Sequence, residues 1–600
     1  MPTQIITNYF KLHNVKQFRE SINETANSVY YVFAGRSLPY SAGDITVDQI
    51  VNTEDSTNYN TQENIVFGKR VGANNVCVST NRFNWTANTI YTPYRNDVVL
   101  EGTQYYVCVN AASIYHIFKC LDNNSNAVSS SKPDASQTSP DDEFYSTADG
   151  YIWKYMYSVD ATVFNNFATS DYMPVVANGQ VVANATSGSI DVITVPFRGS
   201  HYNTTLSNTF ISTDIRVGGN PVKYNIVPTA SANNLFYQSS FIYIASGTGA
   251  GQGRKIVDYV VVANTKTITI ETAFNTVPST DSVYEITPSV LILGDGDDAV
   301  ARAIVNTSIS NSIYQVQIIN RGRNYTYATA EVLGNTGGVS NNAVLNVVMG
   351  PKGGHGSDPE YELGSSVLVI SSKFSNNEIG TIPTENDFRT IGLIKDPLFA
   401  NVGLTVNSIG GSFLIGENVI QANTLATGKV TEFDAISSVA ITNVSGVFIP
   451  GKTITGTTSN STANVVSFNI NGKSKGFDTF DQRARFAFRQ LSDTHKQDEF
   501  VYQTAANGAF SANGYFHSQE GSVNVGTGLF EGNLYLTHVR GTLNTGNTLV
   551  GNTSGAVATL LFKYPPDLSR GSGEIIYVEN LNAVTRSNNQ SETVKIILKF

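Results

Sequence analysis

The chain has 600 residues, 41% of them hydrophobic, and a formal net charge of −10, which predicts about three to five domains rather than one core. Charged residues make up only 14% while Asn, Ser, Thr and Gly abound, so coiled coils and helical solenoids are excluded and sheets joined by tight turns are favoured. The acidic balance argues against nucleic-acid binding, and the absence of an 18-residue apolar run argues against a membrane span. The N-terminal segment does not read as a signal peptide. The cysteines are Cys77, Cys108 and Cys120, and none has C-x-x-C spacing. We therefore expect no disulfide framework and no zinc site, and we expect the chain to be made in a reducing compartment.

The N-terminal third mixes one helix with several strands. Asn14-x-x-Gln17 predicts a capped helix that carries Val15, Phe18 and Ile22 on one face. Strands are predicted over 29–33 and 113–120, and the polar stretch 122–142 is predicted to be an exposed loop.

An Asp-Gly turn then leads into an aromatic strand. The alternation places four rings on one face, and we expect that face to belong to a core rather than an interface: Tyr151, Trp153, Tyr155 and Tyr157. Gly35 and Gly150 are interpreted as turn glycines.

Two internal repeats follow from about residue 179. The segment Ile190–Tyr202, with Arg198-Gly199, recurs 123 residues later as Ile313–Tyr325, with Arg321-Gly322. A second repeat has three copies, which start at Leu404, Val439 and Leu534 and each alternate apolar residues with glycines. Both predict strand–turn–strand units in β-sandwich or small β-barrel modules.

A helix is predicted between the second and third copies of the second repeat. Thr479-x-x-Gln482 resembles a capping box, and apolar residues follow at helical spacing: Phe480, Ala484, Ala487 and Leu491.

The sequence contains few candidate binding or catalytic sites. Ser246–Gly253 superficially resembles a phosphate loop, but it lacks the required spacing and a following helix, so a hairpin turn is favoured. Asp295, Asp297 and Asp298 could hold a hard cation, although a surface turn is the preferred interpretation.

Basic side chains on the predicted helix could bind an anion or a partner's carboxylates, although a solvated or interfacial face is favoured: Arg483, Arg485 and Arg489. The histidines and cysteines match no catalytic motif, so no catalytic residue and no cofactor is predicted and the chain is expected not to be an enzyme.

Several segments, taken in order, carry a family resemblance. They contain these residues: Gly35, Arg36, Ser37 and Pro39; Cys120; Asp149, Gly150, Trp153 and Tyr155; Phe388, Arg389 and Pro397; Gly573, Glu574, Tyr577, Glu579 and Asn580. With the closing Glu592-x-x-x-Ile596-x-Leu598-x-Phe600, this order resembles the baseplate wedge subunit of T-even-type contractile-tailed phages, the product of gene eight. The resemblance covers roughly residues 10–180, 360–400 and 562–600.

The resemblance implies a mainly β, non-enzymatic virion protein. It implies a homodimer within each wedge of the tail baseplate, made in the host cytoplasm and in contact with other wedge proteins. Residues 1–180, 351–401 and 562–600 would form the family framework. Residues 181–350 and 402–561 would be inserted β modules, as in the enlarged members found in phages of marine cyanobacteria.

The closing segment predicts two strands, 574–578 and 593–600, which would bring the C-terminus back to the N-terminal framework. Two other functions stay open. A tail-fibre or adhesin protein could bind host-surface glycan through its β repeats, and so could the inserted modules of a wedge protein. A glycan depolymerase is a third reading, because paired carboxylates leave almost no local sequence signature.

Overall fold

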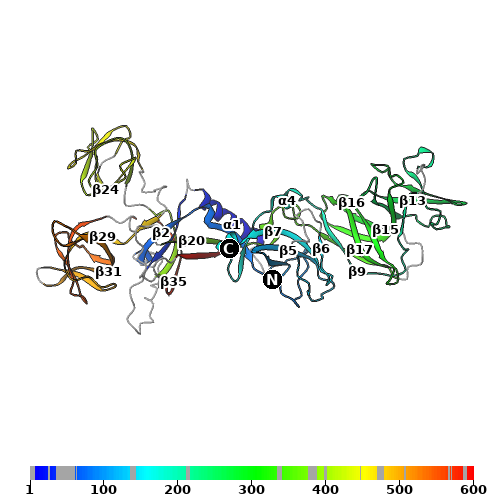
Figure 1. The fold of residues 1–600 in the computed structure, drawn as a ribbon, viewed down its shortest axis with the longest axis horizontal. Coiled ribbons are helices and arrows are strands. Elements are labelled where there is room, and N and C mark those ends of the chain that lie inside the picture. Colours follow the sequence, from blue (N-terminus) through cyan, green and yellow to red (C-terminus); the bar gives the residue numbers. More distant parts are fainter. Residues whose placement is uncertain are drawn as a thin grey trace. The chain divides into compact units, whose positions relative to one another are not determined.

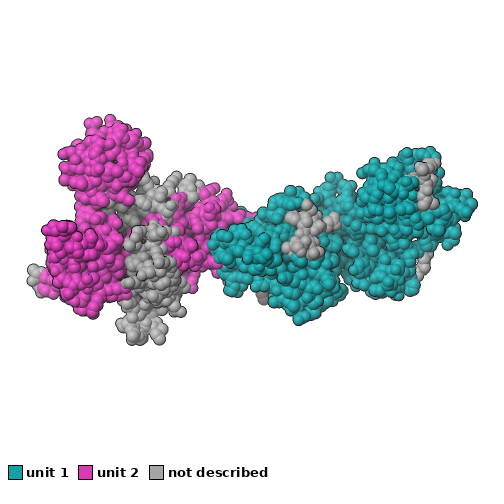
Figure 2. All heavy atoms as spheres, viewed as in Figure 1, with its two compact units in different colours: residues 1–15, 78–367, 599–600 teal, residues 16–77, 368–598 magenta. Residues whose placement is uncertain are grey.

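The computed structural model describes residues 7–24, 28–35, 61–62, 64–134, 144–210, 216–333, 341–375, 388–397, 402–445, 448–468, 479–505, 508–564, 568, 571–584 and 591–600. These residues form two compact units, one of residues 1–15, 78–367 and 599–600 and one of residues 16–77 and 368–598 (Figure 2). The fold is mainly β, with open sheets and two closed barrels, as the alternating sequence predicts (Figure 1).

Helices are short and few among the described residues. They are α1 (Asn8–Asn23), α3 (Ala161–Phe167), α4 (Gly179–Ala183), α5 (Pro359–Glu362) and the 3₁₀ turns η1 (Ala73–Asn75) and η3 (Val217–Gly219). Helix α1 begins before the predicted cap Asn14, because Thr7 Oγ1 accepts a hydrogen bond from Phe10 N at 3.3 Å and caps it earlier. Of the three residues predicted to share one face of this helix, Val15 and Ile22 are buried and Phe18 is half-buried.

The first unit contains a four-stranded antiparallel sheet in the order β4-β5-β7-β6. Its strands are β4 (Tyr106–Ala111), β5 (Ile114–Asp122), β6 (Tyr145–Ser146) and β7 (Ile152–Asp160). A β-bulge at Met156 divides the predicted aromatic face into two parts, because Phe118 pairs with Tyr155 while the preceding Ile117 pairs with Tyr157. Trp153 therefore packs in one core and Tyr157 in another, so the prediction of a single face was wrong at Tyr157.

Strands β3 (Val76–Asn81) and β8 (Tyr172–Pro174) pair through Ser79 and Pro174. The segment predicted to be an exposed loop is packed in part, since Ser129 is fully buried, and residues 135–142 lie outside the described residues.

The rest of the first unit is a nine-stranded sheet and a strand pair. The path β11-β14-β13-β12-β15-β16-β17 carries β10 and β18 as further partners of β15, and β19 pairs with β9. The bounds are β9 (Ile190–Phe197), β10 (Leu206–Thr209), β11 (Lys223–Ile226), β12 (Ser240–Ser246), β13 (Gly253–Val262), β14 (Thr265–Ile270), β15 (Val283–Gly294), β16 (Asp297–Asn306), β17 (Ser312–Arg323), β18 (Ala328–Leu333) and β19 (Val344–Met349).

The first sequence repeat is also a repeat in space. Its two copies are β9 and β17 with their following turns, and their apolar residues share one core. Tyr202 N donates to Asn311 O at 3.0 Å, and Tyr325 N donates to Gly188 O at 3.1 Å, so each copy's turn contacts the residues that precede the other copy's strand. This reciprocal pattern indicates a pseudo-twofold pair.

The second unit contains a five-stranded sheet in the order β28-β2-β1-β21-β35. Its strands are β1 (Tyr30–Gly35), β2 (Ile65–Val71), β21 (Phe388–Lys395), β28 (Thr479–Asp481) and β35 (Glu574–Val584). Strands β20 (Val367–Phe374) and β36 (Glu592–Lys599) are neighbours in another sheet. The two predicted C-terminal strands are thus confirmed as β35 and β36.

The second repeat builds two closed six-stranded barrels with the same strand order. The first is β22-β25-β24-β23-β26-β27, formed by β22 (Val402–Gly410), β23 (Asn418–Gln421), β24 (Thr427–Phe433), β25 (Ser438–Ser445), β26 (Thr453–Gly456) and β27 (Thr462–Phe468). The second is β29-β32-β31-β30-β33-β34, formed by β29 (Ala484–Ser492), β30 (Phe500–Thr504), β31 (Phe510–Val523), β32 (Phe530–Gly541), β33 (Thr548–Gly551) and β34 (Val557–Lys563).

The barrels also repeat a polar contact. Glu417 accepts a hydrogen bond from Ser459 N at 2.9 Å, and Glu499 accepts one from Ser554 N at 2.8 Å. Each carboxylate thereby secures the turn that follows the fifth strand of its barrel.

The helix predicted over 479–491 is wrong. This stretch forms β28 and β29, and Phe486 and Phe488, two positions apart, are both fully buried, which is the period of a strand. Strand β29 and the turn after it are a fourth copy of the second repeat, 82 residues beyond the first copy.

The fourth copy lacks the residues that mark the other three. Asp493 (φ 43°) and Asp498 (φ 63°) stand where the first copy has Gly411 and Gly416, and they adopt the positive φ of those glycines. His495 occupies the position of Phe413, and its side chain is 4% exposed.

Candidate functional site

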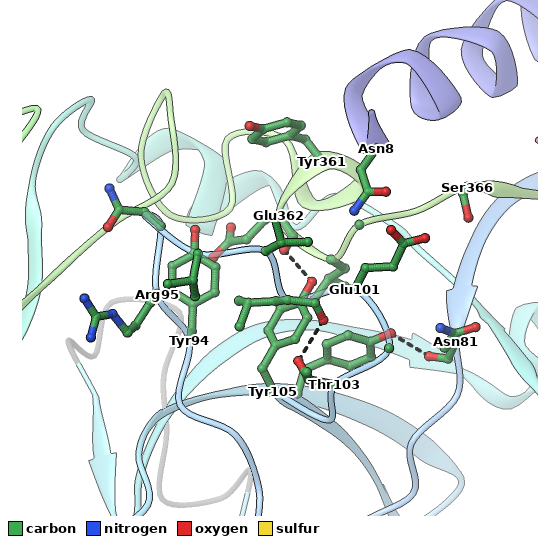
Figure 3. Close-up of a pocket in the computed structure, with 18 of the residues that line it drawn as sticks. Asn8, Asn81, Tyr94, Arg95, Glu101, Thr103, Tyr105, Tyr361, Glu362 and Ser366 are labelled. Carbon is green, nitrogen blue, oxygen red and sulfur yellow. Dashed lines mark hydrogen bonds between the residues drawn. The ribbon is translucent and has the colours of Figure 1, made fainter. Parts of the chain in front are cut away.

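A tyrosine-lined cavity of about 370 Å³ opens in the first unit (Figure 3). The start of α1, the loop over 94–105 and the α5 segment supply its walls. Tyr94 and Tyr105 lie next to Glu362 at its inner wall, where Tyr105 Oη donates to Glu362 O at 3.0 Å. Tyr361, 40% exposed, lies near the mouth.

A cluster of buried charges begins at this inner wall. Lys119, fully buried on β5, donates to Asp191 Oδ2 at 3.1 Å and to Glu362 Oε1. Its ammonium also lies 4.0 Å from the centre of the Tyr94 ring. One lysine therefore joins β5, β9 and α5.

Two more cations surround Asp191. Lys154 on β7 donates to Asp191 Oδ1 at 2.7 Å, and Arg321 Nη1 lies 3.7 Å from the same oxygen. Arg321 Nη1 also donates to the main-chain oxygens of Ile190 and Asp191, each at 3.0 Å. The carboxylate of Asp191 thus ties the four-stranded sheet to the part of the first unit over residues 190–349, which contains both copies of the first repeat and is called the repeat module below.

Glu362 is held from its other side by the segment before α5. Its carboxylate accepts from Gly356 N at 2.7 Å and lies 2.9 Å from His355 Nδ1. His355 Nε2 lies 2.8 Å from Tyr155 O. Burial lowers the pKa of His355, although the Glu362 carboxylate opposes that shift.

The electrostatics keep both carboxylates ionised. Burial alone would raise the pKa of Asp191 and of Glu362, but Lys119 above all outweighs it, and the pKa of Glu362 falls to about 2. Burial lowers the pKa of Lys154 to about 8, with Asp191 opposing the shift and neighbouring cations adding to it. Burial also raises the pKa of Tyr94, with Glu362 adding to it.

These groups are paired charges rather than free nucleophiles or bases. A buried ion pair adds little net stability but fixes geometry, because breaking it leaves an unpaired charge in the interior. The cluster is best suited to lock several elements of the first unit into one arrangement. None of its residues was among the predicted site residues, although a charged residue inside an apolar strand, as at Lys119 and Asp191, is a signal in the sequence that points to such a cluster.

The residues predicted around the aromatic strand come together. Cys120 and Trp153 are fully buried in one core, and Tyr155 is half-buried beside them. Gly150 has φ +83° and is a turn glycine as predicted. Asp149 accepts hydrogen bonds from the main-chain nitrogens of Ser130 and Ser131 at 2.7 and 2.8 Å and from the Thr147 hydroxyl. Burial alone would raise its pKa, but these hydrogen bonds, above all the one from Thr147, hold the pKa below its usual range.

The remaining signature residues gather in the five-stranded sheet of the second unit. Strand β21 starts with Phe388 and Arg389, and β35 carries Glu574, Tyr577, Glu579 and Asn580. Gly573 has φ +82° and approaches Pro397 closely. Arg36, Ser37 and Pro39 lie outside the described residues. Gly35 is the last residue of β1 rather than a turn glycine, because the chain is extended there and passes close to Asn64 O.

The weak metal candidates do not form a site. Asp295 accepts from the main-chain nitrogens of Thr326 and Tyr327 at 2.8 and 3.2 Å, and Asp298 pairs with Arg323 at 2.9 Å. Within the described part of the chain, no group of three or more His, Cys, Asp or Glu residues could hold a metal ion. Asp297 begins β16 and is exposed.

The other candidates are explained by local contacts. Ser246–Gly253 is the turn of the β12–β13 hairpin, as favoured. Arg483 pairs with Asp481 at 2.6 Å, Arg489 pairs with Glu531, and the Arg485 guanidinium lies 4.2 Å from the centre of the Tyr564 ring. The three arginines therefore bind different partners and make no common anion site.

Comparison with known proteins adds no assignment, because no protein-family model and no curated protein matches the chain. Among the helices of the described residues, none combines the length and the hydropathy that a membrane crossing requires.

Proposed function

We propose that this chain is a structural subunit of a contractile-tail baseplate wedge, where it joins neighbouring wedge proteins as a homodimer in the virion. The proposal assigns it no catalytic role and no cofactor. It follows the sequence resemblance, and the observation that carries it is which segments of the chain form neighbouring strands in one sheet of the second unit.

Three resembling segments that are far apart in sequence are adjacent strands of that sheet. Phe33 in β1 pairs with Gly392 in β21, and Gly392 pairs with Val578 in β35. A shared family framework requires such segments to form a common core, since isolated matches would have no reason to meet. This adjacency supports the proposal.

The segments outside the resemblance form modules of their own. The strands between 402 and 563 close into two barrels, apart from the short strand β28, and those between 190 and 349 build the repeat module. Each has its own hydrophobic core. The barrels can be added to a framework without disturbing its core, whereas the repeat module shares buried residues with the four-stranded sheet, among them Asp191, Val192 and Val348.

The first test is the oligomeric state of the purified chain, measured by size-exclusion chromatography with light scattering. The expected mass is about twice 64.7 kDa. The dimer is then mixed with the other wedge proteins encoded by the same phage genome, and a stable complex of defined mass is expected in sedimentation velocity.

Three outcomes would count against the proposal. A trimer that binds no wedge protein would favour a tail-fibre or adhesin protein. Failure of the chain to bind any wedge protein, whatever its own mass, would remove the assembly role. New reducing ends after incubation with envelope polysaccharide would refute the non-enzymatic part.

A further inference from the structure

A second groove in the first unit borders the cavity described above, and Tyr94 and Arg95 line both. Its volume is about 860 Å³, within the range of about 300–1,000 Å³ that is typical of ligand pockets. One wall comes from the turns that follow β5 and precede β7, over 121–125 and 146–150. The other wall comes from β9, β17 and β19 of the repeat module.

The pseudo-twofold repeat explains why this groove carries an aromatic ring. Asp191 in the first copy corresponds to Tyr314 in the second, and Arg321 corresponds to Arg198. In one half the pair is Asp191 with Arg321, inside the buried charge cluster. In the other half Arg198 lies 5.6 Å from the centre of the Tyr314 ring, and that ring is 54% exposed in the groove.

Polar groups complete the lining around the ring. Gln315 and Asn346 are half-buried on the Tyr314 side, and Asp122 and Asn124 lie on the opposite wall. Side-chain amides both donate and accept hydrogen bonds, whereas a carboxylate only accepts. The lining can therefore engage several hydroxyl groups at once.

The two walls are fixed relative to each other by contacts already described. Lys119 and Lys154 belong to the four-stranded sheet, and both donate to Asp191 of β9. On the opposite wall, Asp149 holds its turn through main-chain hydrogen bonds. A groove whose walls are held in this way is largely formed before a ligand arrives, which lowers the entropic cost of binding.

We propose that this groove binds a short neutral oligosaccharide. A sugar ring presents an apolar C–H face that stacks on an exposed tyrosine and hydroxyl groups that pair with amides and carboxylates. Four charged side chains of both signs line the groove: Arg95, Arg198, Asp122 and Asp149. Because Arg95 is already paired with Asp97 at 2.7 Å, the groove has no surplus of cations to attract an anion, which favours a neutral ligand. A nucleotide or another polyanion would meet both carboxylates, and an apolar ligand would leave the lining polar groups unpaired.

The test uses the full chain and an array of defined short oligosaccharides, both neutral and uronic-acid-containing, followed by calorimetric titration of the strongest neutral binder. We expect saturable binding of a neutral oligosaccharide. Tyr314→Ala should weaken it by about tenfold or more, because a stacking partner is lost, whereas Tyr314→Trp should retain it. Tyr327→Ala is the matched control, since Tyr327 belongs to the same module, is 62% exposed and does not line the groove.

A second variant, Asn346→Ala, tests the polar wall and should weaken binding without changing the hydrogen-exchange pattern of the repeat module. The proposal is overturned if no neutral oligosaccharide binds, if only acidic ones bind, or if affinity is the same for the native chain and Tyr314→Ala. These measurements do not depend on wedge assembly, so the groove and the proposed structural role can fail independently.

Discussion

The buried histidine of the second barrel allows a sharp prediction about stability. His495 stands at a position that holds Phe413, Phe448 or Leu543 in the other three copies of the repeat, and all four side chains are buried. The His495 ring stacks on Phe516 with centroids 5.3 Å apart, and neither of its nitrogens has a hydrogen-bond partner among the described residues. The substitution His495→Phe should therefore stabilise this barrel.

The magnitude follows from those two nitrogens. A buried polar group without a partner costs about 1–3 kcal/mol, and a phenyl ring already fits the equivalent position in two copies, so we expect His495→Phe to stabilise the second barrel by about 1–3 kcal/mol. The reciprocal variant Phe413→His should destabilise the first barrel by about 2–4 kcal/mol, because apolar contacts are lost and two unpaired nitrogens are introduced.

The same residue makes the barrel sensitive to acid. Burial lowers the pKa of His495, with Glu499 opposing the shift, so the folded barrel releases its proton more readily than the unfolded chain. As pH falls below the unfolded value of about 6.5, the unfolded state takes up the proton first and stability declines until the folded pKa is reached. Above about pH 6.5 the stability from this group is fully present, and His495→Phe should abolish this part of the pH dependence.

Hydrogen exchange followed by mass spectrometry measures each barrel separately, which matters because a chain of several modules does not unfold in two states. Peptides from 484–563 should gain protection in His495→Phe, whereas those from 402–468 should not change. The reasoning is refuted if His495→Phe lowers the protection of the second barrel. It is also refuted if the second barrel of the variant loses as much protection between pH 6.5 and pH 5 as the second barrel of the native chain, after correction for intrinsic exchange.

Three further predictions concern other parts of the chain. Asp191→Asn should destabilise the first unit by about 3–5 kcal/mol, because it leaves buried lysines without their carboxylate. Hydrogen exchange measures this loss, with Asp297→Asn at an exposed position as the control, and an unchanged first unit would contradict the prediction. Gly150→Ala should cost about 1–2 kcal/mol, since φ is +83° and a Cβ would lie 2.7 Å from Asn124 Nδ2; equal thermal stability would contradict it. Deletion of residues 591–600, which removes β36, should abolish soluble folding, and a soluble dimeric truncation would disprove that expectation.

Much of the fold could be predicted because its determinants are local. Alternating apolar residues and turn glycines predict strand–turn–strand units, and three copies of the second repeat carry both signals. The fourth copy was hidden because Asp493 and Asp498 supply the positive φ without glycine and His495 replaces the phenylalanine. The apolar residues Phe480, Ala484, Ala487 and Leu491 also matched a helical spacing, which strand pairing in the barrel overrides.

Lys119 and Asp191 stand out in the sequence as charges inside apolar strands, but their partners in the buried charge cluster could not be predicted because the members are distant in sequence. Lys119 and Glu362 are 243 residues apart, and only the fold brings them into contact. The bulge that separates Tyr157 from Trp153 is equally invisible, since one extra residue in a strand leaves no mark in the alternation. The resembling segments, by contrast, were found from short motifs, and three of them lie side by side in β1, β21 and β35.

The order of strands in that sheet has a consequence for synthesis on the ribosome. The strand at one edge, β35, ends at Val584, whereas β1 near the middle ends at Gly35, so the sheet cannot close until almost the whole chain has been translated. At about 5–20 residues per second, roughly half a minute to two minutes pass between the synthesis of β1 and that of β35, the last strand of its sheet. Each barrel, built from fewer than a hundred consecutive residues, can fold within that interval, so we expect the modules to be finished before the sheet that carries them.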